Sequence, residues 1–133
     1  MKNFDMSEFA CRCCGRLPPS ARKNIEALVT EVLEPVRREL GRAVSVNSGY
    51  RCPGHNAAVG GVPGSLHLSG EAADLQAGDG TEALARAIEA RGKYDQLIRY
   101  LNPDGSTRFV HVSWRRVGGN RKQKFEKHIR QER

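Results

Sequence analysis

The stretch Ser65-Leu-His-Leu-Ser-Gly-Glu-Ala-Ala-Asp74 carries the most information in this chain of 133 residues. It places the imidazole of His67 close in sequence to the carboxylate of Asp74, and a second imidazole, His111, follows in a short apolar run. Two imidazoles and one carboxylate suit a zinc ion that keeps its fourth position open for water, as catalytic zinc sites do. Alone, His111 is more often a core or edge histidine, and any loop can hold a His and an Asp. The three residues gain weight only in combination.

Length and composition predict one domain of ordinary soluble type. The apolar share is 38% and the charged share 28%, both typical of globular proteins. No stretch is long and apolar enough for a membrane span, and the N-terminus lacks the apolar core of a signal peptide. We therefore expect a chain that is cytoplasmic as synthesised and not inserted in a membrane, with a monomer as the default.

The net charge of +7 is concentrated near the C-terminus, where residues 115–133 carry eight Lys and Arg against two Glu. We divide the chain accordingly into a domain over residues 1–114 and a basic C-terminal tail over residues 115–133. The tail is interpreted as a solvated terminal segment, with contact to nucleic acid or another anionic polymer as the alternative. Apart from Phe125, the tail lacks the aromatic residues of a base-stacking surface, which disfavours nucleic acid as a partner.

Four cysteines are present, and three of them form a C-x-C-C cluster rather than the plain C-x2-C pair of common structural zinc sites. They are Cys11, Cys13, Cys14 and Cys52. Without an export signal, reduced thiols are the default. A disulfide from Cys52 to the cluster and a second, structural zinc site remain as alternatives.

The apolar spacing predicts three helices. The first begins at Ser20 and runs to about Leu40, with a kink or break at Pro35. A short helix opens at Pro53 and ends at Gly60–Gly61. The third is capped by Thr81 and runs to about Arg91.

Four strands are predicted, namely 44–47, 72–76, 96–101 and 108–114, and the last two form a hairpin around the turn 102–105. Alternation along the last strand puts Phe109, His111 and Ser113 on one face and Val110 and Val112 on the other. The order of elements predicts an α+β fold, with a small, mostly antiparallel sheet packed with helices.

The motifs, taken in order along the chain, resemble the M15 family of zinc peptidases, and most closely its small single-domain members, often encoded by phages. The matching motifs are Gly49-Tyr-Arg-Cys-Pro53, Asn56, Val59-Gly-Gly61, Ser65-x-His67-x-x-Gly70-x-Ala72-x-Asp74, Asp95-Gln-Leu-Ile98 and Val110-His-Val-Ser113. The family includes D-alanyl-D-alanine carboxypeptidases and enzymes that cut peptidoglycan peptides. The resemblance implies a fold similar to the Hedgehog and DD-peptidase domains and a zinc-activated water that attacks a peptide bond of a peptidoglycan stem peptide. It also implies release to the cell wall through a partner pore.

The resemblance also assigns roles to residues. His67, Asp74 and His111 would hold zinc, and Ser65 would support the site from its rim and contact substrate. Arg51 would bind a terminal carboxylate of the substrate or stabilise the oxyanion, because its planar guanidinium matches a carboxylate. A surface ion pair is the alternative for Arg51.

One departure from the family concerns the general base. In much of the family an Asp or Glu lies three residues before the last histidine ligand, and here that position is Arg108. Where close relatives often carry a Glu after Asp-Gln-Leu-Ile, this chain has Tyr100. Asp95 remains as a candidate base or orienting group, with a strand-end residue that accepts backbone amides as the alternative. Glu71 is expected to face solvent.

Three hypotheses follow. The first is a zinc-dependent D,D-carboxypeptidase or endopeptidase that acts on peptidoglycan. The second is a catalytically impaired metal-binding domain of the same family that recognises cell-wall peptide. The third, a nucleic-acid-binding module led by the basic tail, leaves the ligand set unexplained.

Overall fold

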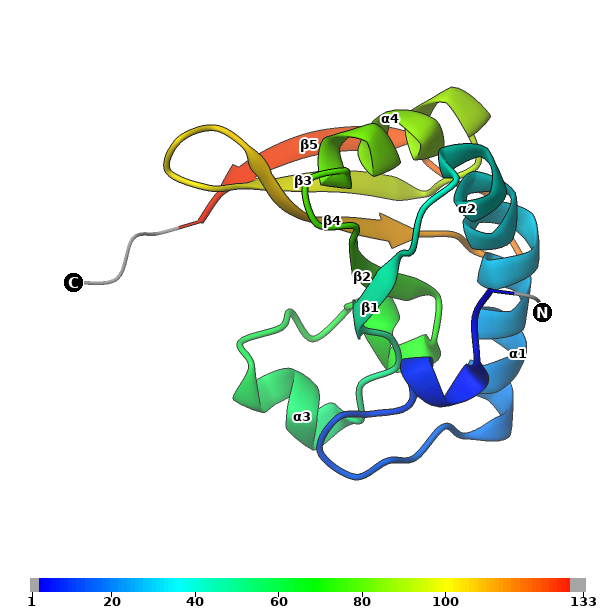
Figure 1. The fold of residues 1–133 in the computed structure, drawn as a ribbon. Helices are drawn as coiled ribbons and strands as arrows, with labels where there is room; N and C mark the ends of the chain where they lie inside the picture. The colour runs from blue at the N-terminus through cyan, green and yellow to red at the C-terminus, as the bar shows by residue number, and fades with distance from the viewer. Residues whose placement is uncertain (1–2, 130–133) are drawn as a thin grey trace.

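The fold is an α+β arrangement in which a five-stranded sheet carries helices on one side. The computed structural model describes residues 3–129. The helical elements, in chain order, are η1 (Met6–Phe9), α1 (Pro19–Leu28), η2 (Val29–Leu33), α2 (Glu34–Leu40), α3 (Pro53–Ala58), η3 (Leu66–Ser69) and α4 (Thr81–Arg91). The strands are β1 (Ser45–Ser48), β2 (Ala72–Gln76), β3 (Gln96–Leu101), β4 (Thr107–Ser113) and β5 (Gln123–His128). Figure 1 shows α1 and α2 along one side of the molecule and α3 apart from them.

The sheet has the strand order β1-β2-β4-β3-β5. Its first three pairings are antiparallel, and β3 pairs with β5 in parallel. The predicted hairpin is present, although its second strand begins and ends one residue earlier than expected. The mostly antiparallel sheet and the α+β class are therefore confirmed.

The first predicted helix is one continuous helical run with a wider, π-helical segment, η2, in its middle. Pro35 accounts for this segment, because proline lacks an N–H and its ring crowds the carbonyl four residues earlier. That carbonyl belongs to Glu31, and it accepts a hydrogen bond from Arg91 Nε instead. The helix therefore passes through the proline without a break.

The two faces of the sheet differ in what covers them. The core packs the apolar stripe of α1, η2 and α2 and the inner face of α4 against alternate residues of the strands, among them Leu75, Val110 and Val112. The side chains between them, including Asp74 and His111, lie on the opposite face and line a cleft. The alternation predicted for β4 is confirmed, and it places the ligand candidates away from the helices.

The C-terminal residues 123–128 form β5, which the sequence pattern did not predict. We expected a solvated segment here, and most β5 side chains are indeed exposed. Its backbone nevertheless pairs with β3 over six residues, so this part of the basic segment is an edge strand of the sheet. Arg130 and Arg133 lie outside the described residues. Within residues 3–129, no helix is long and apolar enough to cross a membrane.

Candidate metal centre

Strand pairing brings Asp74 and His111 together. They are direct partners in the antiparallel register of β2 and β4, so their side chains leave the same face of the sheet. His111 Nδ1 lies 2.9 Å from Asp74 Oδ1. The sheet therefore fixes two of the three predicted ligands without help from any loop.

The third ligand candidate, His67, reaches the same point from η3. Ser65 caps this short helix, because its hydroxyl accepts a hydrogen bond from the His67 backbone N–H at 3.2 Å. Gly70 ends it with a φ of 75°, and a side chain at Gly70 would collide with the backbone of Ala21 in α1. The serine and glycine of the motif thus set where the histidine between them points.

The imidazole of His67 offers an unpaired nitrogen to the site. Its Nδ1 lies 2.6 Å from the carbonyl oxygen of Gly49, so this nitrogen carries the proton and donates it, while Nε2 keeps a free lone pair. His67 is 2% exposed, and Nε2 is a buried atom without a hydrogen-bond partner. It faces Asp74 Oδ1 at 3.4 Å. A buried acceptor aimed at a carboxylate is costly unless a cation lies between them.

All three groups converge tightly enough to hold one metal ion. A ring nitrogen of each histidine and a carboxylate oxygen of Asp74 lie within 4.8 Å of one another. Burial opposes ionisation of Asp74, but its contacts with the imidazoles, above all the hydrogen bond from His111, outweigh it, so the pKa of this carboxyl lies well below its ordinary value. Two imidazoles and an ionised carboxylate fit zinc, and the carbonyl behind His67 is the outer partner that zinc-binding histidines usually have.

Arg51 lies at the edge of this cluster and is held there by three side chains. Its Nη2 donates to Asp74 Oδ2 at 3.1 Å, its Nε to Ser48 Oγ at 3.1 Å and its Nη1 to Asn56 Oδ1 at 3.4 Å. The Arg51 side chain is 16% exposed. Arg51 therefore does form an ion pair, the alternative considered from the sequence. The pair is largely buried rather than on the surface, and its partner is Asp74, a ligand candidate inside the cleft.

The cleft around the cluster has a volume of about 480 Å³ and collects residues from distant segments. Its charged and aromatic lining residues are Arg51, His67, Asp74, Tyr100, Phe109, His111, Arg121 and Lys127, and the loop 59–66 forms one wall. Among these lining residues Asp74 is the only carboxylate. Arg121 and Lys127 come from the C-terminal segment, and sequence reasoning missed them because it did not place that segment beside β3.

The structure does not bring Asp95 into the cleft. Its carboxylate is fully buried and accepts hydrogen bonds from the backbone N–H of Arg121 at 2.8 Å and from Arg121 Nη2 at 2.6 Å. The Arg121 side chain thereby lowers the pKa of Asp95. This geometry favours the alternative for Asp95, a strand-end residue that accepts a backbone amide, over the role of a base in the cleft.

Two further residues named in the search for a base, Glu71 and Arg108, also lie elsewhere. Glu71 is only 15% exposed at its side chain and pairs with Ser69 and Arg115, so it is less solvent-facing than expected. Arg108 is exposed and donates to Asn102 Oδ1 at 2.7 Å. Neither lines the cleft.

Tyr100, at the position where the resemblance leads us to expect a Glu, lines the cleft. Its ring stacks on Phe109 with centroids 4.3 Å apart, and Lys127 Nζ lies 5.9 Å from the same ring. Burial and the negative charge of Asp74 raise the pKa of the Tyr100 phenol. The hydroxyl is therefore protonated near neutral pH, where it can donate a hydrogen bond but cannot act as a base.

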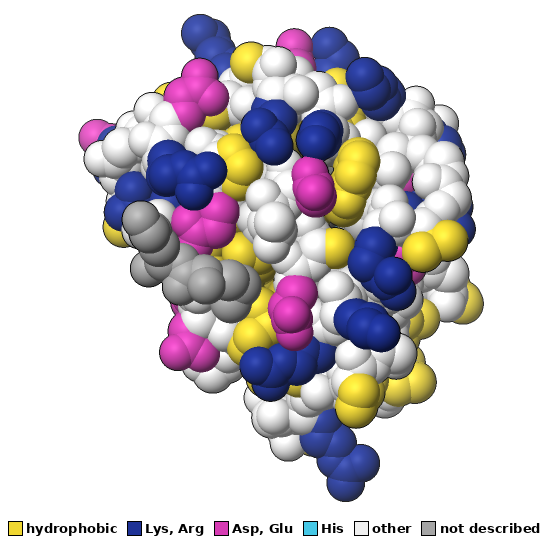
Figure 2. Space-filling view, turned by 90° about the vertical axis from the view of Figure 1, so that its right-hand side faces the viewer, with side chains coloured by type: hydrophobic (Ala, Val, Ile, Leu, Met, Phe, Trp, Pro, Cys, Tyr) yellow, Lys and Arg dark blue, Asp and Glu magenta, His cyan; other side chains and the backbone are white. Residues whose placement is uncertain are grey.

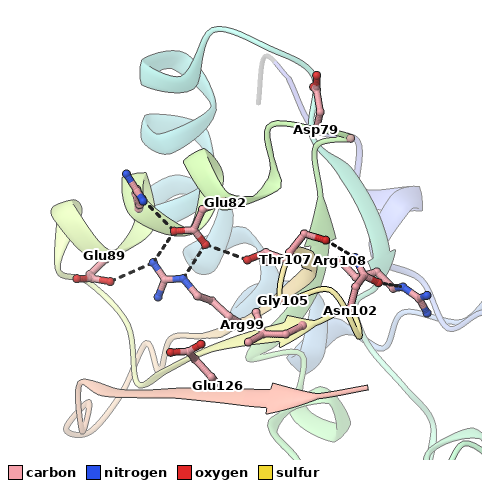
Figure 3. A pocket seen from close by; sticks show the side chains of 13 residues that line it. Asp79, Glu82, Glu89, Arg99, Asn102, Gly105, Thr107, Arg108 and Glu126 are labelled. Carbon is pink, nitrogen blue, oxygen red and sulfur yellow. Dashed lines mark hydrogen bonds and ion pairs between the residues drawn. The ribbon is translucent and has the colours of Figure 1, made fainter. Parts of the chain in front are cut away.

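A larger hollow of about 980 Å³ lies elsewhere on the molecule, against α4 and the β3–β4 turn. Figure 3 shows that several of its charged side chains bond to one another: Arg99 pairs with Glu82 and Glu89, and Thr107 donates to Glu82. These pairs neutralise the charges of Arg99, Glu82 and Glu89 within the pocket. The metal centre remains the better candidate site.

The basic residues of the C-terminal segment are partly neutralised by acidic partners. Arg121 pairs with Asp95, and Lys124 Nζ lies 3.3 Å from Glu89. On the face that carries α1 and α2, Lys and Arg side chains are interspersed with acidic and neutral ones (Figure 2). That face shows no continuous basic surface of the kind that binds nucleic acid.

Comparisons with known proteins agree with this geometry. The family model described as Peptidase M15 matches residues 2–113. A zinc D-Ala-D-Ala carboxypeptidase from Streptomyces albus G is 43% identical over 97 residues, which cover 68% of this chain and 38% of that protein. This chain thus spans less than half the length of that relative.

Proposed function

This chain belongs to the M15 peptidase family, and from that premise we propose that it is a zinc-dependent peptidase that hydrolyses peptidoglycan stem peptides. The observation that carries the proposal is the buried, unpartnered Nε2 of His67, aimed at Asp74 beside His111 in a cleft. The D-Ala-D-Ala named for the relative supports a substrate of this class. Both a D,D-carboxypeptidase and an endopeptidase fit the family.

The residues of the cluster have separate tasks in this proposal. His67, Asp74 and His111 would hold zinc, which supplies Lewis acidity and lowers the pKa of water to about 7. The Gly49 carbonyl keeps the proton on Nδ1 of His67, so that Nε2 presents its lone pair. The burial of the three ligand side chains keeps them in position before substrate arrives.

The cations of the cleft determine which peptides it accepts. Arg51, Lys127 and Arg121 line it together, Arg121 with its charge partly neutralised by Asp95, so the cleft favours a peptide that carries carboxylates. Arg51 is the cation held against the ligand cluster, and its guanidinium is suited to a terminal carboxylate or to the oxyanion of the reacting carbonyl. We propose the first role for a carboxypeptidase substrate and the second for an internal bond. Ser65, on the rim, contacts the peptide backbone in this proposal.

The direct test uses zinc-loaded full-length protein with two substrates. We expect release of D-alanine from a soluble stem peptide ending in D-Ala-D-Ala if the chain is a carboxypeptidase, and new free amines in cross-linked peptidoglycan if it is an endopeptidase. A metal chelator should abolish either reaction, and added zinc should restore it. Binding of peptidoglycan without either product would overturn the enzymatic proposal.

One observation favours a second candidate, a catalytically impaired domain that binds cell-wall peptide. No carboxylate other than Asp74 lines the cleft within residues 3–129, although a general base usually contributes 10²–10⁴-fold. In this alternative the ligand cluster and the cations still bind zinc and peptide.

Substitutions at Tyr100 distinguish the two candidates. If the phenol donates a hydrogen bond to the reacting peptide, Tyr100→Phe should lower kcat/KM by roughly tenfold or more, because a donor to a developing charge is lost. Tyr100→Glu restores a carboxylate and, in the impaired alternative, should raise hydrolysis by about 10²-fold. Zinc content, measured alongside, should stay unchanged in both.

Tyr94→Phe serves as the matched control, because it removes a tyrosine hydroxyl that does not line the cleft. Equal activities of the wild type, Tyr100→Phe and Tyr100→Glu would show that position 100 has no part in the reaction.

A further inference from the structure

The four cysteines of the chain form a second cluster, which shares no residue with the cluster of His67, Asp74 and His111. Their Sγ atoms all lie within 4.8 Å of one another. Cys13 Sγ is 3.5 Å from Cys11 Sγ and 3.5 Å from Cys52 Sγ. Three of the thiols come from one loop, and Cys52 comes from the segment before α3. Small domains commonly cross-link a loop to a distant segment through cysteines of both, by a disulfide or a metal ion.

The separations match a shared metal ion better than a disulfide. A disulfide bond is about 2.05 Å long, whereas the closest sulfur pairs here are 3.5 Å apart. Four thiolates at a Zn–S distance of about 2.3 Å form a tetrahedron with edges of roughly 3.8 Å. The two shortest printed contacts, both 3.5 Å, lie just below that edge, and no pair of these sulfur atoms is more than 4.8 Å apart.

The loop backbone presents the thiols toward one centre. Cys11 and Cys14 are separated by two residues, the C-x2-C spacing of structural zinc sites, which the intervening Cys13 obscured in the sequence. Gly15 follows with a φ of 71°, and its N–H donates to the Cys11 carbonyl at 2.7 Å. The Cys52 N–H points at Cys11 Sγ at 3.4 Å. A tight turn thus directs the local thiols toward the distant one.

Hydrophobic burial alone holds this loop weakly. Beside the main core, the loop shares only a small apolar cluster in which Cys11, Ala21 and Tyr50 are buried. Cys13 and Cys14 are exposed. Clusters of this size contribute little stability, and small folds commonly replace the missing contacts with a metal.

We propose that Cys11, Cys13, Cys14 and Cys52 bind a structural zinc ion, a second metal site independent of the histidine cluster. Four protein ligands fill a tetrahedral shell and leave no open position, so this site has no catalytic chemistry of its own. The site acts by holding its neighbours in place. Cys52 is bonded directly to Arg51, and Phe9, two residues before Cys11, lies against Gly49, whose carbonyl orients His67. The thiolate site therefore fixes the segment that carries Arg51.

Metal analysis of the purified full-length chain tests this proposal. We expect about two zinc ions per chain in the wild type and about one in Cys14→Ser, Cys52→Ser and His67→Ala, with the residual ion at the other site in each case. Cys52→Ser combined with His67→Ala should bind none. Arg16→Ser is the matched control, because it changes an exposed side chain next to the loop and leaves every thiol in place.

A measurement on the wild type keeps the test valid if the cysteine variants do not fold. Substitution with Co²⁺ should give the intense sulfur-to-metal charge-transfer absorption of a thiolate site, and this band should persist in His67→Ala. A single zinc ion per chain, with four thiols freely reactive before chelation, would overturn the proposal, as would an intact mass that shows a disulfide. Because this readout needs no peptide substrate, a protein with two zinc ions and no peptidase activity would refute only the proposed function.

Discussion

His67→Ala should remove the zinc ion of the histidine cluster and lower peptide hydrolysis by a factor on the order of 10³ or more. The substitution deletes the proposed ligand whose buried, unpartnered Nε2 already faces Asp74. Metal catalysis supplies several kcal/mol of transition-state stabilisation, and each 1.36 kcal/mol corresponds to about tenfold in rate. Zinc content and the release of D-alanine or new amines are the two measurements.

The chain provides a matched control for this experiment. His128 is an exposed histidine on β5 that lies outside the ligand cluster, so His128→Ala should keep both zinc and activity. His67→Ala also leaves the Gly49 carbonyl unpaired, at a cost of about 1–3 kcal/mol in stability. Circular dichroism therefore has to separate loss of metal from loss of fold in this variant. A folded His67→Ala protein with wild-type zinc content would contradict the assignment of this ligand.

Asp95→Asn should lower the free energy of unfolding by about 2 kcal/mol and the Tm by roughly 6 °C. The carboxylate is fully buried and engaged by Arg121, but the Arg121 side chain is 55% exposed. Solvent therefore screens part of the pair, and we expect less than the full cost of breaking a buried ion pair. Thermal unfolding at neutral pH measures the loss, and zinc content should not change.

The same pair predicts how stability depends on pH. The pKa of Asp95 is lower in the folded protein than its ordinary value of about 3.9. Its stabilising effect is therefore complete above about pH 4 and is lost as the pH falls through the folded pKa. The difference between wild type and Asp95→Asn should shrink in acid, whereas Asp104→Asn, a control on an exposed turn, should show little difference at neutral pH. A loss of activity without loss of stability would return Asp95 to a catalytic role.

The elements with a strong local pattern could be predicted from the sequence. The predicted strand 72–76 coincides with β2, because an apolar run carries Asp74 between turn signals. In β4, strict alternation around His111 predicted which side chains face the core and which face the cleft. Such elements are visible in the sequence because alternate residues of a strand point to opposite faces, and the apolar ones mark the face toward the core.

The elements that depend on distant partners could not be predicted. β5 has few buried side chains, and only the free edge of β3 makes it a strand, so its local pattern reads as a solvated segment. The Asp95–Arg121 ion pair also depends on the pairing of β5 with β3, so the sequence pattern does not predict it either. Likewise, no residue pattern indicates that the Gly49 carbonyl determines the tautomer of His67, since the contact is made by backbone.

The candidate ligands and two of the cations of the cleft come from different parts of the chain, and this separation has an evolutionary consequence. The family match ends at residue 113, whereas Arg121 and Lys127 follow it, Lys127 on β5 and Arg121 two residues before that strand. Mutations in this C-terminal segment can alter the charge that lines the cleft without disturbing His67, Asp74 or His111. If the proposed function holds, selection can change the preferred peptide through this segment while the proposed metal ligands stay unchanged.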